Sequence, residues 1–167
     1  MDIKKGSLQD LGNVMEIINN CVEDMEARGI NQWIAEFYPA EDIIKRDIDS
    51  GFLYVLKDKS DYLGTITINE NQPSEYQEVE WLIKEGKIMV IHRLAVDPKY
   101  QHSGNGSKLM NFVESYALKK KYDAIRLDAY SGNPAVLSFY EDRGYKKMGE
   151  VYFPRRERPF YCYEKLV

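Results

Sequence analysis

Cysteine, histidine and tryptophan are scarce in this 167-residue chain, which contains two of each. Cys21 and Cys162 lie far apart in sequence and match no metal-ligand spacing, so the sequence predicts no metal centre and no cysteine chemistry. A positive charge excess is also missing, because Lys and Arg total 23 against 27 for Asp and Glu, a formal net charge of −4. This balance argues against a general nucleic-acid binder, since such proteins usually carry a basic surplus.

Long apolar runs are absent too. No stretch of about 18 apolar residues predicts a membrane span. The first residues, Met1 to Lys5, are followed by no apolar signal region, so we expect a cytoplasmic protein with reduced thiols. Hydrophobic residues make up 44% and charged residues 30% of the chain. This composition is typical of a globular protein, and we expect one domain over residues 1–167.

Hydrophobic periodicity indicates where helices and strands form. Apolar residues at steps of three and four predict a helix from Ser7 to Gly29, with Ser7 and Asp10 as a weak capping box. Further helices are predicted over residues 40–50, 107–121 and 133–143. Strands are predicted over residues 3–5, 52–57, 62–69, 88–96, 124–129, 146–152 and 160–166.

The order of these segments indicates how the strands pair. Strands 52–57 and 62–69 are joined by a short turn-forming cluster, which predicts an antiparallel hairpin. Strands 88–96 and 124–129 are separated by a helix, which predicts a parallel pair with a crossover connection. The sequence therefore predicts an α/β fold (α+β by some schemes) built on a mixed, mostly antiparallel sheet.

A glycine-containing loop between strand 88–96 and the next helix is the most informative segment. Gly104 and Gly106 lack Cβ atoms, so backbone N–H groups there can surround an anion. The first turn of the following helix adds unsatisfied N–H donors and a positive dipole end. Together these features suit a pyrophosphate.

Two common nucleotide-binding loops do not match this segment. A P-loop requires a glycine five positions before its Gly-Lys-Ser/Thr, and Gly106-Ser107-Lys108 has none there. The dinucleotide fingerprint requires a third glycine where this chain has Leu109. An NAD-type binding module is therefore disfavoured, also because the strand order begins with a hairpin.

The loop Gln101-His102-Ser103-Gly104-Asn105-Gly106 resembles the pyrophosphate loop of the GNAT superfamily of N-acetyltransferases. Arg93-Leu94-Ala95-Val96-Asp97-Pro98 precedes it at the spacing usual in that family. Downstream, Asn133-Pro134-Ala135 and the segment from Phe139 to Tyr145 resemble a second family hallmark. The resemblance covers nearly the whole chain. It implies a parallel β-α-β unit that binds the cofactor and helices on both faces of the sheet.

The resemblance also implies an activity, transfer of an acetyl group from acetyl-CoA to a primary amine by direct attack in a ternary complex. The acceptor would be a small molecule or a peptide, and the reaction would need no metal. A non-catalytic acyl-CoA sensor or regulatory protein is the alternative. A homodimer formed through sheet edges or the C-terminal strands is common in the family, and the oligomeric state stays open.

Cofactor contacts are implied residue by residue. Strand residues would bind the pantetheine arm through their main chain, and the loop would bind the pyrophosphate. Asn133 would contact the cofactor near the leaving group, although a plain helix N-cap explains it equally well. The implied set is Leu94, Ala95, Val96, Gln101, His102, Ser103, Gly104, Asn105, Gly106, Ser107 and Asn133.

Tyr140 resembles the tyrosine that protonates the departing CoA thiolate, and its alternative role is packing on a helix face. An acceptor amine is mostly protonated at neutral pH, so a base must remove a proton before attack. His92 and Glu80 are the candidate bases, and a water chain is the alternative to both.

The acceptor pocket is the least defined part of the expected site. Gln32, Trp33 and Tyr38 resemble the region that walls this pocket in the superfamily, although aromatic residues in such a connection also serve as core anchors. The arginines at positions 155, 156 and 158 would hold a substrate carboxylate or form a solvated turn.

Overall fold

The computed structural model describes residues 1–167 and contains seven strands in one sheet, in the order β1-β2-β3-β4-β5-β7-β6. The strands are β1 (Asp2–Lys5), β2 (Leu53–Asp58), β3 (Asp61–Asn69), β4 (Ile88–Val96), β5 (Ala124–Tyr130), β6 (Lys146–Val151) and β7 (Phe160–Leu166). The helices are α1 (Leu11–Ala27), α2 (Glu41–Asp49), α3 (Asn105–Lys119) and α4 (Pro134–Glu141), with 3-10 turns η1 (Leu8–Asp10), η2 (Ser74–Glu78) and η3 (Pro98–Tyr100). The predicted mixed α/β fold is confirmed. None of the helices combines the length and apolar character that a membrane span requires.

Contacts within the chain gather in two compact units. The first unit comprises residues 1–29, 33–68 and 91–113, and the second comprises residues 30–32, 69–90 and 114–167. Both β4 and α3 contribute residues to each unit. The expectation of a single domain stays a prediction.

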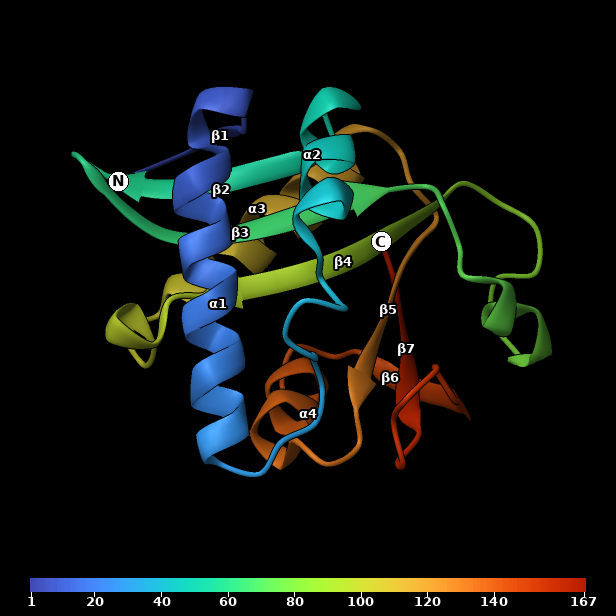
Figure 1. Ribbon diagram of the computed structural model, residues 1–167. Coiled ribbons are helices and arrows are strands. Elements are labelled where there is room, and N and C mark those ends of the chain that lie inside the picture. The colour runs from blue at the N-terminus through green and yellow to red at the C-terminus, as the bar shows by residue number, and fades with distance from the viewer. The chain divides into compact units, whose positions relative to one another are not determined.

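The first unit is built on the antiparallel strands β1, β2 and β3. Ile3 pairs with Leu56 and Leu53 pairs with Thr67, so the predicted hairpin is confirmed. Helices α1 and α2 lie on one face of these strands and α3 lies on the other (Figure 1). Gly64 on β3 permits a close strand approach, because a Cβ there would lie 2.7 Å from the carbonyl oxygen of Ala95.

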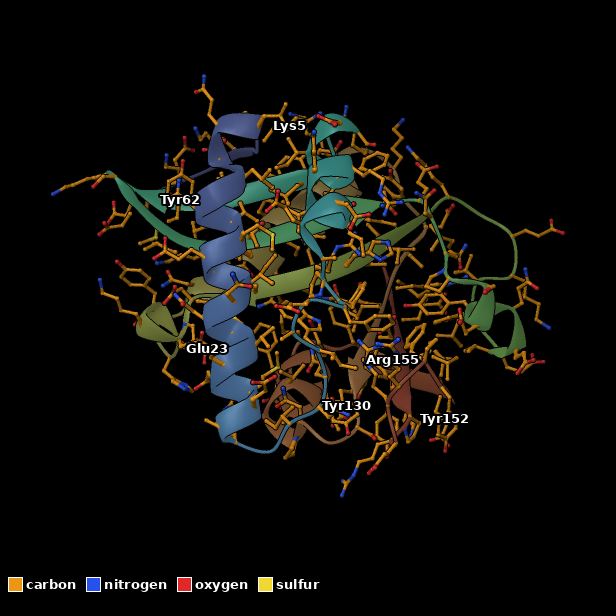
Figure 2. The ribbon with its side chains drawn as sticks, viewed as in Figure 1. Lys5, Glu23, Tyr62, Tyr130, Tyr152 and Arg155 are labelled. Atoms are coloured by element: carbon orange, nitrogen blue, oxygen red, sulfur yellow. The ribbon has the colours of Figure 1, made fainter.

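The predicted helix from Ser7 begins with a tighter turn than expected. Residues 8–10 form the 3-10 turn η1, and the α-helix starts at Leu11. The Ser7 N–H and hydroxyl both donate to Asp10 Oδ2, at 2.9 and 2.7 Å. The Tyr62 hydroxyl donates to the other Asp10 oxygen (Figure 2). Asp10 therefore closes the first turn, as the Ser7–Asp10 capping interpretation predicts.

The second unit contains the parallel strand pair. Ile88, Met89 and Val90 of β4 pair with Ala124, Ile125 and Arg126 of β5, which confirms the predicted parallel arrangement. On its other edge β5 pairs antiparallel with β7 along its whole length. Strand β7 then pairs antiparallel with β6.

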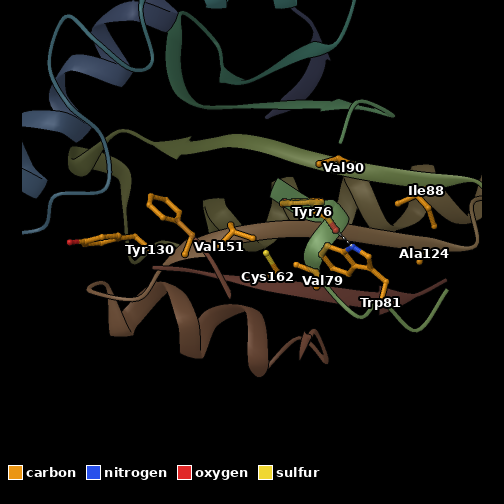
Figure 3. Close-up of a cluster of buried hydrophobic side chains, with 10 residues drawn as sticks. Tyr76, Val79, Trp81, Ile88, Val90, Ala124, Tyr130, Val151 and Cys162 are labelled. Atoms are coloured by element: carbon orange, nitrogen blue, oxygen red, sulfur yellow. Dashed lines mark hydrogen bonds between the residues drawn. The ribbon is translucent and has the colours of Figure 1, made fainter. Parts of the chain in front are cut away.

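The segment between β3 and β4 supplies part of the second unit's core. Tyr76, Val79 and Trp81 belong to a buried cluster with residues of β4, β5, β6 and β7 (Figure 3). The Trp81 indole N–H donates to the carbonyl oxygen of Tyr76 at 2.9 Å. Because these residues follow no regular period, hydrophobic patterning did not predict the segment as core.

A buried ion pair fastens this segment to the sheet. The Arg126 Nε lies 2.8 Å from Glu164 Oε1, and the two side chains are only 5% and 0% exposed. Glu164 also accepts the Leu82 N–H at 2.7 Å, while Arg126 donates to the carbonyl oxygen of Ile83. The Arg126 guanidinium lies 4.2 Å from the Trp81 ring centroid, within cation–π range.

We expect Glu164→Gln to lower the free energy of unfolding by about 3–5 kcal/mol, because it leaves the buried Arg126 charge uncompensated. Urea unfolding followed by circular dichroism measures this change. Glu150→Gln is the matched control, since it removes the same charge from an ion pair with Lys147 in which Glu150 is 48% exposed. We expect the control to change stability by less than about 0.5 kcal/mol. Equal effects would contradict the role assigned to the buried pair.

Candidate active site

The turn that follows β4 is anchored before the glycine loop begins. Asp97 is 9% exposed, and its side chain accepts the Lys99 N–H at 2.9 Å at the start of η3. Its other oxygen accepts a hydrogen bond from Asn20 of α1 at 2.7 Å. The strand end is therefore held against α1, which gives the loop a fixed starting point.

The glycine loop has two residues with a left-handed backbone, His102 at φ 58° and Gly104 at φ 77°. The Gln101 side chain turns back and donates to the carbonyl oxygen of Val96 at 3.0 Å. The loop is thereby closed on the end of the strand that leads into it.

Helix α3 begins at Asn105, two residues before the predicted start at Ser107. The Gly104 carbonyl oxygen accepts the Lys108 N–H at 3.0 Å, and the buried Asn105 side chain donates to the Tyr100 carbonyl oxygen at 2.8 Å. Gly106 therefore lies in the first helical turn instead of in the loop. The free N–H groups of a helix start are placed directly at the glycine loop.

Strand β4 carries a left-handed residue at Arg93, with φ 49°. Its guanidinium donates twice to Asp47 Oδ2, at 2.9 and 2.6 Å, and once to the Tyr38 hydroxyl at 2.9 Å. Burial alone would lower the pKa of Arg93, but Tyr38 and Asp47 outweigh it and raise the pKa. The network fixes the backbone immediately before Leu94, Ala95 and Val96.

Two of the three predicted acceptor residues lie in the first unit. Trp33 is 7% exposed and is part of the core. Tyr38 and Ile34 exchange two backbone hydrogen bonds of 2.9 Å, which close the connection into a tight loop. Tyr38 thus joins this connection to β4 through Arg93.

The third predicted acceptor residue, Gln32, lies in the second unit beside Asn133. Asn133 is 4% exposed at the N-cap of α4, yet its side chain makes no capping hydrogen bond. Its Nδ2 instead donates to Gln32 Oε1 at 3.2 Å. The Arg156 guanidinium donates to the Gln32 carbonyl oxygen through Nε at 3.3 Å and Nη2 at 3.2 Å. Two separate chain segments, at Asn133 and at Arg156, therefore converge on Gln32.

The other two arginines of the loop between β6 and β7 differ from Arg156. Arg155, which Figure 2 labels, is exposed, as is Arg158, whereas Arg156 is half-buried. The Arg156 guanidinium is oriented by the carbonyl oxygens of Gln32 and Pro154.

Tyr140 lies on α4 and is 6% exposed. Its ring packs against those of Tyr145 and Tyr163, with centroids 5.9 and 6.2 Å away. Burial raises the pKa of Tyr140, the negative charge of Asp128 adds to this effect, and Arg143 opposes it. The phenol is therefore protonated at neutral pH, as a proton donor must be, and it also contributes to packing.

The two candidate bases occupy different surroundings. Glu80 is in the second unit, and its side chain is 90% exposed with Lys84 Nζ 3.9 Å away. His92 is half-buried on β4 in the first unit. Both assignments stay predictions.

Asp47 and Asp128, which the sequence did not predict as site residues, bind defined partners. Asp47 on α2 accepts the Arg93 bonds and a 2.9 Å hydrogen bond from Thr67. Asp128 on β5 accepts the Tyr76 hydroxyl at 2.8 Å. The sequence signal for Asp128 was that a charged residue lies within an otherwise largely apolar strand. Strand alternation places Asp128 on the same face as Arg126.

The two cysteines are buried thiols. Burial raises the pKa of Cys21 to about 12 and that of Cys162 to about 12. Both thiols are therefore protonated and poorly nucleophilic at neutral pH.

Comparison with known proteins identifies the family. The model of the acetyltransferase (GNAT) family matches residues 16–145, so the chain belongs to this family, as the glycine-loop resemblance predicts.

Two relatives from Bacillus subtilis are N-acetyltransferases. The uncharacterized N-acetyltransferase YesJ is 28% identical over 84% of this chain and 79% of its own length. An S-alkylcysteine N-acetyltransferase is 24% identical over 90% of this chain and 79% of its own length.

Solved structures share the fold. A GNAT-family acetyltransferase from Streptococcus agalactiae superimposes with a TM-score of 0.83 at 19% identity, covering 99% of this chain and 95% of its own. The PaiA N-acetyltransferase from Thermoplasma acidophilum, solved in complex with coenzyme A, gives a TM-score of 0.73 at 21% identity, covering 99% of this chain and 98% of its own.

We expect Gly104→Ala to weaken coenzyme A binding by about 5–30-fold. Alanine disfavours the left-handed backbone by about 1–2 kcal/mol, and binding must restore that conformation. Isothermal titration calorimetry with coenzyme A measures the change.

Gly29→Ala is the matched control, because Gly29 also has a positive φ of 70° and a Cβ at either glycine would meet no atom within 4 Å. The control should lose similar stability but keep its affinity for coenzyme A within about twofold of wild type. A Gly104→Ala variant with unchanged affinity would place the pyrophosphate elsewhere.

Proposed function

We propose that this protein is an acetyl-CoA-dependent N-acetyltransferase that acts on a primary amine by direct attack in a ternary complex. The observation that carries this proposal is the loop from Gln101 to Ser107. In a member of the GNAT family, this loop combines a left-handed glycine with the N-terminus of a fifteen-residue helix.

The residues present suit a pyrophosphate at that loop. A Cβ built on Gly104 meets no atom within 4 Å, so the glycine borders open space. The N–H groups at the start of α3 supply donors, and the helix dipole favours an anion there. The main chain of Leu94, Ala95 and Val96 would bind the pantetheine arm, and Asn133 would contact the cofactor near the leaving group.

The proposed reaction needs three contributions from the protein. A β4 backbone N–H would polarise the thioester carbonyl, and a preorganised donor of this kind contributes on the order of 10²–10³ in rate. Tyr140 would give its proton to the departing thiolate. A base would take a proton from the acceptor, for which His92 and Glu80 are the sequence-based candidates.

The acceptor we propose is the amino group of a small amino-acid-like molecule or of a peptide. One relative is named for S-alkylcysteine, a primary amine with a neighbouring carboxylate. We assign the binding of that carboxylate to Arg156, whose guanidinium is oriented by two hydrogen bonds to the Gln32 carbonyl oxygen.

We expect coenzyme A to raise the melting temperature more than NAD or ATP does. Ligand at 100 times its Kd stabilises by about 2.7 kcal/mol, which corresponds to about 5–10 °C for a domain of this size. A thermal-shift assay measures this difference, and a thiol-release assay with an amine panel and acetyl-CoA then tests transfer. A larger shift with NAD would contradict the proposed function, and coenzyme A binding without transfer to any amine would favour the sensor alternative.

We expect Tyr140→Phe to lower turnover by about 10²-fold while leaving coenzyme A affinity nearly unchanged, because the ring still packs but the proton donor is gone. Steady-state kinetics with acetyl-CoA measures the loss, which should shrink for acyl donors with a more acidic thiol.

Tyr145→Phe is the matched control from the same ring cluster, since the buried Tyr145 hydroxyl has no hydrogen-bond partner. Its removal should leave turnover unchanged and should not destabilise the fold. Equal turnover for Tyr140→Phe and wild type, with chemistry rate-limiting, would remove Tyr140 from the mechanism.

A further inference from the structure

Asp128 is a half-buried carboxylate held in place by a buried tyrosine. It lies on β5, and its Oδ2 accepts the Tyr76 hydroxyl at 2.8 Å. Tyr76 is itself 2% exposed, with its ring 5.0 Å from that of Trp81. The phenol hydroxyl of Tyr76 therefore fixes the orientation of the Asp128 carboxylate.

The positive charge of Arg126, the neighbour of Asp128 on the same strand face, is balanced by Glu164. Alternation along β5 places Arg126 and Asp128 on one face, and Arg126 forms its ion pair with Glu164 at 2.8 Å. The charge of Asp128 is therefore not needed to compensate Arg126.

Asp128 and Tyr140 lie on opposite faces of the β5–β7 pair. The strand register pairs Asp128 with Cys162 and Leu127 with Tyr163. Cys162 belongs to the buried cluster that contains Tyr76 (Figure 3), whereas the Tyr140 ring packs against Tyr163. Because neighbouring residues on a strand point to opposite faces, the carboxylate and the phenol flank β5 at adjacent positions.

This placement suits the two proton transfers of the proposed reaction. The attacking nitrogen must lose protons, while the departing sulfur must gain one, and both atoms are bonded to the same tetrahedral carbon. Groups on the two faces of β5 can both reach this carbon at the edge of the strand beyond Arg126, where the pairing of β5 with β4 ends. There the carboxylate would serve the nitrogen, and the phenol would serve the sulfur first and the nitrogen afterwards. The charge of Asp128 is near enough to Tyr140 to contribute to its raised pKa.

We propose that Asp128 is the catalytic carboxylate that binds the protonated amino group of the acceptor and accepts a proton from it, with Tyr76 as its positioning residue. This assignment rests on the proposed N-acetyltransferase function and deepens it. It names the acceptor class as alkylammonium ions, because an ionised carboxylate in this position would favour a cationic amine over a neutral one.

The step balances as follows. The ammonium group gives one proton to the Asp128 carboxylate, and the resulting amine attacks the thioester carbon, forming the C–N bond. Collapse of the tetrahedral intermediate breaks the C–S bond, and the thiolate takes the proton of Tyr140. The second nitrogen proton restores Tyr140, and Asp128 releases its proton to solvent. Ammonium and thioester thus yield amide, thiol and one proton.

The burial of Asp128 distinguishes it from Glu80, whose side chain is 90% exposed. Solvent screens an exposed carboxylate strongly, whereas a half-buried one attracts a cation through a lower effective dielectric. Asp128 is thus better placed than Glu80 to hold an ammonium group.

The test compares two amines that differ mainly in pKa. The probe is the best acceptor from a panel of S-methylcysteine, benzylamine and butylamine, together with a fluorinated analogue of it, whose lower amine pKa leaves more neutral amine. We expect Asp128→Asn to lower kcat/KM for the parent amine by about 10²–10³-fold, and for the fluorinated analogue by at least about tenfold less. Coenzyme A affinity should stay within about twofold of wild type.

Companion variants keep the test decisive. Tyr76→Phe should give a smaller loss, about 3–10-fold, with the same dependence on amine pKa, and it carries the test if Asp128→Asn does not fold. Asp128→Glu should recover part of the activity because it restores the carboxylate. Glu150→Gln removes an equal charge from the same unit, at a side chain that is 48% exposed, and should leave both amines unaffected.

Three results would overturn the assignment. An equal loss for both amines would indicate a merely structural role for Asp128. A loss that depends on amine pKa in Glu80→Gln or a His92 variant, but not in Asp128→Asn, would place the base there. Absence of transfer to every amine by wild-type protein that binds coenzyme A would instead overturn the proposed function, and this assignment with it.

Discussion

The ion pair between Arg126 and Glu164 is the interaction on which the arrangement of the second unit depends. It is almost fully buried, and both partners also bond the chain at residues 82 and 83. Trp81 packs on the same guanidinium and donates to the carbonyl oxygen of Tyr76. Tyr76 in turn holds Asp128, so a charge pair deep in the sheet helps to determine where the Asp128 carboxylate lies. Burial of charges is costly, and here the bonds to neighbouring backbone groups offset part of that cost.

In the first unit, bonds to a charged side chain likewise hold a backbone segment in place, here at a strained position of β4. A left-handed residue within a strand costs free energy, and Arg93 persists in this conformation because its side chain is bound by Asp47 and Tyr38. These two partners come from α2 and from the connection that precedes it. The main chain at Leu94 to Val96, which the family resemblance assigns to the cofactor, therefore follows a segment that side chains from two other elements hold in place.

Much of the fold could be predicted because its signals are local. Apolar steps of three and four and strand alternation each depend on neighbouring residues, and the predicted elements agree with the structure to within a few residues. The start of α3 was predicted two residues late, because the Asn105 side chain and the Gly104 carbonyl oxygen add a turn through bonds that no pattern of hydrophobicity shows.

The candidate site likewise contains residues that local sequence patterns predict and residues that they do not. The glycine loop could be predicted, since a phosphate-binding backbone requires glycine at particular positions. Asp128 and Asp47 could not, because their partners lie 52 and 46 residues away in sequence. Such pairs form only in the folded sheet. In the sequence alone, their charged side chains cannot be told apart from ordinary surface residues.

Asn133 shows how site geometry and helix stability compete. Its side chain occupies the N-cap position of α4 but bonds Gln32 instead of the helix backbone, so α4 begins without the side-chain cap that asparagine normally supplies. Mutations that restore capping would strengthen the helix and weaken the link to Gln32 at the same time. Selection for thermostability alone would therefore tend to drive this position away from the residue that bonds Gln32, so helix stability and this long-range contact oppose each other.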